Sequence, residues 1–330
     1  MKQIVFSRCP VGSITEYLMR TGELQEVVAN AGGSFKFLQQ LPVVYQEAHF
    51  TQTYPLDIRE GGNIPPIWAQ SRGDTTALIG VTFLPELEGL LVASDSSYRS
   101  LTDLAGKRIG IPIRPGMPID FQKYVAIRGI SQHLQEEGLA ISDVTIVPVA
   151  CRERTVEQSE SLNIAKREFE GCTEEFKAVL EGICEAAFAN SVKALRLEES
   201  GDFRNVVEPN KQIAINSRNN NSPLLITASH RVIDEHPEIV AAYMDLSIQK
   251  SVFLQDNPEA YYNVVSSGVY EATPKELKTV YNEDAHKLRC PALGVKELTA
   301  VEDQVRFLYD SGAIENIVDV SKWINVVFLT

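Results

Sequence analysis

The N-terminal segment has the pattern of a strand, a helix and a second strand, which limits the fold more than any other feature of the chain. A short apolar run at residues 4–7 predicts a buried strand. Apolar residues then recur at helical spacing over residues 13–30, where a Gly-Gly pair ends the helix. Residues 35–41 predict the second strand. Because strands joined through a helix pair in parallel, we expect an α/β fold of mixed, mostly parallel sheets flanked by helices.

The same patterns continue through the rest of the chain. Strands are predicted at residues 77–83, 89–93, 144–149, 186–188 and 224–227, and helices at residues 121–137 and 176–181. The remainder has a largely helical pattern, with Pro237, Pro258 and Pro274 at expected helix starts, where the missing N–H costs nothing.

Two changes in composition predict two lobes. A polar stretch begins at residue 95, and a run of three asparagines occupies residues 219–221. We therefore expect residues 1–95 and 222–330 to form lobe I, and residues 96–221 to form an inserted lobe II that closes over a cleft. Ligands of such sheets bind at the carboxyl ends of strands, between the lobes.

Composition excludes several classes of function. The 330 residues carry a net charge of −13, with no basic run long enough for nucleic-acid binding. The chain has no run of 18 apolar residues, so no membrane span is predicted. The chain passes from Met1 almost directly into a strand-like run without the pattern of a signal peptide, so we expect a cytoplasmic protein. A monomer is a separate expectation.

The five cysteines are widely spaced, which argues against both a disulfide framework and a zinc site of CxxC type. Cys9 follows the first strand and precedes the expected helix. A thiol at a helix N-terminus is stabilised as thiolate by the helix dipole, and strand-to-helix turns of α/β folds often carry function. The alternative is a small buried core residue. Cys151 follows another strand and is a reserve candidate, whereas Cys172 and Cys184 are expected in the core.

Two further residues have chemistry suited to a cleft. His49 could hold or relay a proton of a neighbouring thiol, because its side chain titrates near neutrality. Arg59 precedes Gly61 and Gly62, which predict a tight turn whose N–H groups form an anion-binding nest, with the guanidinium as a planar fork for an oxyanion. The alternatives are an ordinary histidine and a plain turn with a surface arginine. The other four histidines (His133, His230, His236 and His286) have no partners at ligand spacing.

Three short segments together resemble a known enzyme family. They are Ser7-Arg8-Cys9-Pro10-Val11, His49-Phe50-Thr51, and Arg59-Glu60-Gly61-Gly62 with Ile64-Pro65-Pro66. These segments are similar to those of the 2′-hydroxybiphenyl-2-sulfinate desulfinase family, in which a Cys, a His and an Arg form the active site. The ten-residue spacing from His49 to Arg59 is the most specific part of the match. Residues 112–124 and 152–169, which would line the substrate end of the cleft, depart from the family pattern.

The resemblance implies a two-lobed fold of the periplasmic-binding-protein type (type II) and a desulfinase that releases sulfite from an organic sulfinate without a metal or organic cofactor. It implies catalytic roles for Cys9, His49 and Arg59, and substrate binding by Ser7, Gly61 and Gly62. Cys9 would act either as a nucleophile on sulfur or as the proton donor to carbon. Two alternatives remain open: a solute-binding protein that captures a small anion without catalysis, and a relative of thiamine-pyrimidine synthases, whose cysteine-rich motif this chain lacks.

Overall fold

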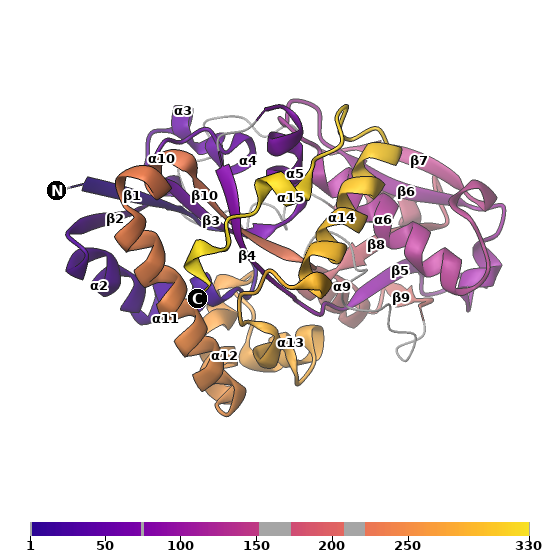
Figure 1. Ribbon diagram of the computed structural model, residues 1–330. Coiled ribbons are helices and arrows are strands. Elements are labelled where there is room, and N and C mark those ends of the chain that lie inside the picture. The colour runs from indigo at the N-terminus through magenta and orange to yellow at the C-terminus, as the bar shows by residue number, and fades with distance from the viewer. Residues whose placement is uncertain (1, 74–75, 152–172, 208–221, 330) are drawn as a thin grey trace.

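A computed structural model describes residues 2–73, 76–151, 173–207 and 222–329, and it contains two five-stranded sheets (Figure 1). The first sheet has the order β2 (Gly33–Phe37), β1 (Lys2–Ser7), β3 (Asp57–Gly62), β10 (Leu224–Ser229) and β4 (Thr76–Thr82). The second has the order β7 (Thr145–Ala150), β6 (Arg108–Ile113), β8 (Ala186–Asn190), β5 (Glu88–Ala93) and β9 (Phe203–Asn205). The predicted two-lobed α/β architecture is present.

Each sheet is mixed, as predicted, but parallel pairing does not dominate. In the first sheet β1 is parallel to β2 and β3, while β10 is antiparallel to β3 and β4. The second sheet repeats this arrangement, with β6 parallel to β7 and β8, and β5 antiparallel to β8 and β9.

The passage between the sheets differs from the predicted boundary. Because β5 belongs to the second sheet, the chain leaves the first sheet before Glu88, ahead of the boundary predicted at residue 95. The chain returns to the first sheet between β9 and β10, on either side of residues 208–221, which lie outside the described part.

The helices of the first lobe surround its sheet. The predicted helix over residues 13–30 is two helices, because Gly22 has a left-handed φ of 81°. Proline occupies the first position of α11, α12 and α13, as predicted. The helices of this lobe are α1 (Ile14–Thr21), α2 (Glu23–Asn30), α3 (Val43–Gln46), α4 (Ala48–Thr51), α5 (Ile64–Ser71), α10 (His230–Glu235), α11 (Pro237–Gln255), α12 (Pro258–Val265) and α13 (Pro274–Tyr281).

The second lobe carries α6 (Phe121–Glu136), α8 (Glu174–Leu180) and α9 (Ser191–Glu199), and the chain ends with α14 (Val295–Asp310) and α15 (Val320–Trp323). One apolar cluster joins Val301 and Leu308 of α14 to Ile130 of α6. Arg128 of α6 also forms an ion pair with Asp303 of α14. Helix α14 therefore packs against both α5 of the first lobe and α6 of the second (Figure 1). No helix among the described residues has the length and hydropathy needed to cross a bilayer.

Candidate active site

A cleft is lined by residues of both lobes. From the first lobe come Cys9, His49 and Arg59, so the structure brings the three predicted catalytic residues onto one surface. Residues of α6, β8 and α9 form the opposite side: Phe121, Gln122, Val125, Ala126, Phe188, Ala189, Asn190 and Lys193.

Cys9 lies in the loop after β1 rather than in the first turn of a helix. The helix α1 begins only at Ile14, where the side chain of Ser13 accepts a hydrogen bond from the Glu16 N–H at 3.0 Å. The predicted helix-dipole environment of the thiol is therefore wrong, because the loop extends further than the sequence pattern indicated. The positive charge beside Cys9 comes instead from Arg59, which interacts with it electrostatically.

Gly61 explains how the thiol and the guanidinium come together. A Cβ atom built on Gly61 would lie 2.8 Å from the Cys9 Sγ and 3.1 Å from an Nη atom of Arg59. Both functional groups therefore occupy the space above a residue that has no side chain. Glycine at this position permits the close approach of a strand to the loop that carries Cys9.

We expect Gly61→Ala to reduce activity strongly, because the added methyl group would lie 2.6 Å from the Cys9 Cβ and would push the loop away from Arg59. Gly80→Ala is the matched control, since its added Cβ meets only side chains of the core, the nearest at 3.1 Å. Turnover of the two variants should be compared at equal folded concentration. Full activity of Gly61→Ala would show that the Cys9 loop can move without consequence.

Arg59 is held inside the first sheet. It lies on β3 opposite Ser7 of β1 and Thr227 of β10, and only 1% of its surface is exposed. One Nη group donates a hydrogen bond to the Gly62 carbonyl at 3.1 Å, which fixes the plane of the guanidinium. Burial lowers the pKa of Arg59, and the neighbouring Cys9, Asp57 and Glu60 oppose this effect. An arginine remains charged under these conditions.

The predicted anion-binding nest at Gly61 and Gly62 is wrong. β3 continues through both glycines, which pair with Leu225 and Leu224 of β10, and neither has a positive φ. A nest requires a turn with alternating helical conformations, whereas these residues are extended. Gly62 lines the cleft, and Gly61 packs beneath Cys9.

Ser7 lies beside the site rather than in it. Its hydroxyl is 3.1 Å from each carboxylate oxygen of Asp57, and Ser7 is not among the described residues that line the cleft. Burial raises the pKa of Asp57 to about 8, although the bond from Ser7 and the charge of Arg59 act in the opposite direction. The hydroxyl of Ser7 is therefore directed to a buried carboxyl behind the cleft and away from the residues that line it.

We expect Asp57→Asn to change the pH dependence of stability. Asp57 stays protonated in the folded state up to about pH 8, whereas in the unfolded chain it ionises near its ordinary value of 3.8. The carboxyl therefore makes the folded state progressively less stable as pH rises between these two values. The Asn variant, which retains a partner for Ser7, should gain stability over the parent across this window. Denaturant unfolding at pH 5 and pH 8 measures the free energy of unfolding of the Asn variant relative to the parent. The same difference at both pH values would contradict the raised pKa of Asp57.

His49 and an apolar wall complete the cleft. His49 is buried on α4, with its ring edge-to-face against Phe50 at a centroid distance of 4.9 Å. Phe50 stacks on Phe121 of the second lobe at 5.9 Å. Because Phe121, Gln122 and Pro112 line the cleft, the segment that departs from the family pattern does form part of its wall. The other departing segment lies outside the described residues.

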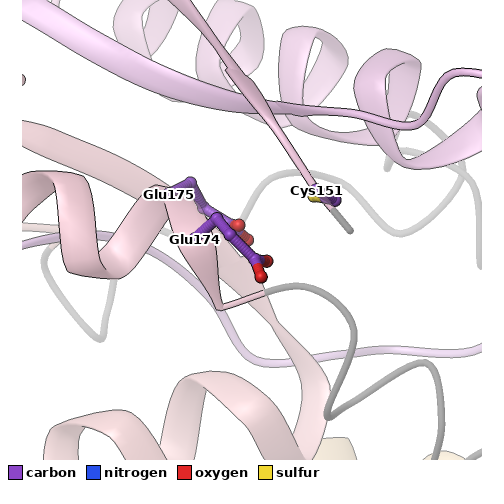
Figure 2. Close-up of side chains that lie close together, drawn as sticks. All are labelled: Cys151, Glu174 and Glu175. Atoms are coloured by element: carbon purple, nitrogen blue, oxygen red, sulfur yellow. The ribbon is translucent and has the colours of Figure 1, made fainter. Parts of the chain in front are cut away.

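The second lobe also contributes charged groups that the sequence did not single out. Lys193 donates to Glu175 at 2.7 Å, and both line the cleft. Glu175 in turn lies beside Glu174 and Cys151, the reserve candidate (Figure 2). Cys151 is buried and is not among the described residues that line the cleft. No local motif marks these residues, because the fold brings them together from separate elements.

Comparison with known proteins gives relatives over nearly the whole chain, although no family model matches. The chain is 23% identical to the 2′-hydroxybiphenyl-2-sulfinate desulfinases of Rhodococcus erythropolis and Rhodococcus qingshengii, over 99% of this chain and 92% of each relative. The predicted resemblance is confirmed.

Solved structures confirm the predicted fold. A cysteine-to-serine mutant of the desulfurization enzyme DSZB, in complex with biphenyl-2-sulfinic acid, superposes with a TM-score of 0.80 at 22% identity, over 99% of this chain and 97% of that one. A periplasmic sulfonate-binding protein from Methylobacillus flagellatus KT gives a TM-score of 0.71 at 17% identity, over 100% and 93% of the two chains. The chain therefore has the two-lobed fold of periplasmic binding proteins.

Proposed function

We propose that this protein is a desulfinase that cleaves the carbon–sulfur bond of an aromatic sulfinate and releases sulfite. The observation that carries the proposal is the meeting of Cys9, His49 and Arg59 on one cleft with an aromatic wall. The desulfinases that resemble this chain over nearly its whole length support the same reaction class. The proposal defines the organic group of the substrate as a class, an arene that fits against Phe50 and Phe121.

Arg59 binds the sulfinate group in this proposal. Its guanidinium presents parallel N–H donors to two oxygens of one anion, and the bond to the Gly62 carbonyl orients the fork. The surrounding sheet excludes water from the arginine, so its charge acts on the anion with little screening.

Cys9 performs the bond cleavage by one of two balanced routes. As a thiolate it attacks sulfur, the ring carbon takes a proton, and the resulting S-sulfinate of Cys9 reacts with water to give the thiol and hydrogen sulfite. As a thiol it protonates the ring carbon while the carbon–sulfur bond breaks, and the released sulfur dioxide reacts with water to give hydrogen sulfite and a proton. Both routes convert one sulfinate and one water into one arene and one hydrogen sulfite.

His49 moves the proton in either route. A histidine can return a proton to Cys9 after each turnover or deliver one to the ring carbon, because its two ring nitrogens can accept and donate protons. Its contact with Phe50 places it at the edge of the aromatic wall. Neither route draws on a metal or an organic cofactor.

We also propose that the protein works in the cytoplasm as a monomer. The reaction needs the thiol of Cys9 in its reduced state, outside any disulfide, and the reducing cytoplasm maintains thiols in that state. Cell fractionation and sedimentation of the purified protein would test these two points, and recovery in an oxidising compartment or as a stable dimer would contradict them.

A panel of aryl and alkyl sulfinates tests the proposed function by sulfite release. Turnover of aryl sulfinates with equimolar arene would support it, and absence of sulfite from the whole panel would refute it. The similarity to a sulfonate-binding protein supports a second candidate, capture of a sulfur oxyanion without chemistry. Under that reading, the parent turns over no sulfinate and Cys9→Ser leaves ligand affinity unchanged, whereas a desulfinase turns sulfinates over and loses this turnover in Cys9→Ser.

A further inference from the structure

A thiol and two carboxylates meet at one end of the second lobe, outside the chemistry described above. Cys151 directly follows β7, and Glu174 and Glu175 open α8. One ligand atom from each of the three lies within 4.8 Å of the others. Figure 2 shows the two carboxylates side by side, facing the end of the strand that carries Cys151.

Glu175 is unusual within this group. Its side chain is 1% exposed, and one carboxylate oxygen accepts the hydrogen bond from Lys193 at 2.7 Å. The second oxygen, Oε2, is buried and has no hydrogen-bond partner among the described residues. A buried carboxylate oxygen without a partner is costly, and the nearby carboxylate of Glu174 adds repulsion. Lys193 pairs with Glu175 and brings one positive charge to the two carboxylates, so negative charge exceeds positive charge among the described residues of the cluster.

We propose that Cys151, Glu174 and Glu175 bind one divalent cation of the zinc type. Sulfur favours Zn²⁺ over Mg²⁺ or Ca²⁺, and carboxylate oxygens complete a mixed ligand set. Bonds of about 2.0–2.3 Å in a tetrahedron place ligand atoms about 3.3–3.8 Å apart. Atoms that already lie within 4.8 Å reach this spacing by small side-chain rotations. Water occupies the remaining coordination position.

The cation would fasten α8 to the end of β7. Because Glu175 and its partner Lys193 also line the cleft, the cation would fix part of the wall formed by the second lobe. This role is structural, and it is independent of the desulfinase chemistry at Cys9 and Arg59.

Cation binding can be measured directly in the full-length Cys9→Ser protein, in which the thiol of the cleft is removed as a competing ligand. Titration with Zn²⁺ by calorimetry, and with Cd²⁺ by the ultraviolet absorption of the cadmium–thiolate bond, should show one equivalent bound. Adding Cys151→Ala should abolish the absorption and weaken Zn²⁺ binding by at least about tenfold. Glu174→Gln should weaken Zn²⁺ binding while retaining the absorption.

Cys290→Ala is the matched control, because Cys290 is partly buried and lies outside this group of ligands. In the Cys9→Ser background it should leave both titrations unchanged. The proposal is overturned if the Cys9→Ser protein binds no cation, or if binding persists unaltered in Cys151→Ala and Glu174→Gln proteins whose thermal unfolding shows them to be folded.

Discussion

Replacement of Cys9 by serine is expected to abolish sulfite release while the protein remains folded. In both routes the sulfur of Cys9 either attacks or donates the proton, and a serine hydroxyl is a far weaker nucleophile and acid. A positioned acid or base alone contributes about 10²–10⁴ in rate, so the loss should be at least of this size. Initial rates of sulfite release at saturating substrate measure it.

Cys290→Ser provides the comparison for this experiment, since it makes the same exchange at a thiol outside the cleft. Its rate and its unfolding temperature should match those of the parent. Near-full activity in the Cys9→Ser protein would remove Cys9 from the reaction and with it both proposed routes.

Arg59→Ala is expected to raise KM and lower kcat together. The substitution removes two charge-assisted hydrogen bonds to the anion, each worth about 1.5–3 kcal/mol, which corresponds to a loss of about 10²–10⁴ in kcat/KM. Arg59→Lys keeps the charge but loses the planar fork, so it should recover only part of the loss. Measuring kcat and KM separately on an aryl sulfinate distinguishes the variants.

Arg128→Ala serves as the control for removal of a buried arginine. Arg128 pairs with Asp303 and is not among the described residues that line the cleft. Its loss should lower the free energy of unfolding while kcat and KM of the folded protein are preserved. An Arg59→Ala protein that behaves like Arg128→Ala would show that Arg59 supports the sheet and does not bind substrate.

The sequence predicted the elements that depend on local periodicity. The strand before Cys9, the strand at residues 89–93 and the long helix from Phe121 have strong patterns and lie close to their predicted positions. The meeting of Cys9 with His49 and Arg59 was predicted through the resemblance, because each residue belongs to a short matched segment.

The predictions that failed depend on contacts between distant segments. Gly61 and Gly62 have the local character of a turn, yet pairing with β10 keeps them extended. Ser7 lies near Cys9 in sequence, but its side chain bonds to Asp57. Glu175 and Lys193 could not be predicted as cleft residues, because nothing in their local sequence reflects the ion pair that joins α8 to α9.

The position of β10 in the first sheet has a consequence for folding during synthesis. β10 lies between β3 and β4, yet it follows the whole second sheet in sequence. During synthesis, β3 and β4 therefore lack their shared partner β10 until the entire second lobe has left the ribosome. Arg59 acquires its neighbour Thr227 only when this late strand arrives. We therefore expect the pairing of β10 with β3 and β4, which completes the surface around Arg59, to be a slow, long-range step of folding. We also expect chaperones to bind the incomplete first lobe before this step.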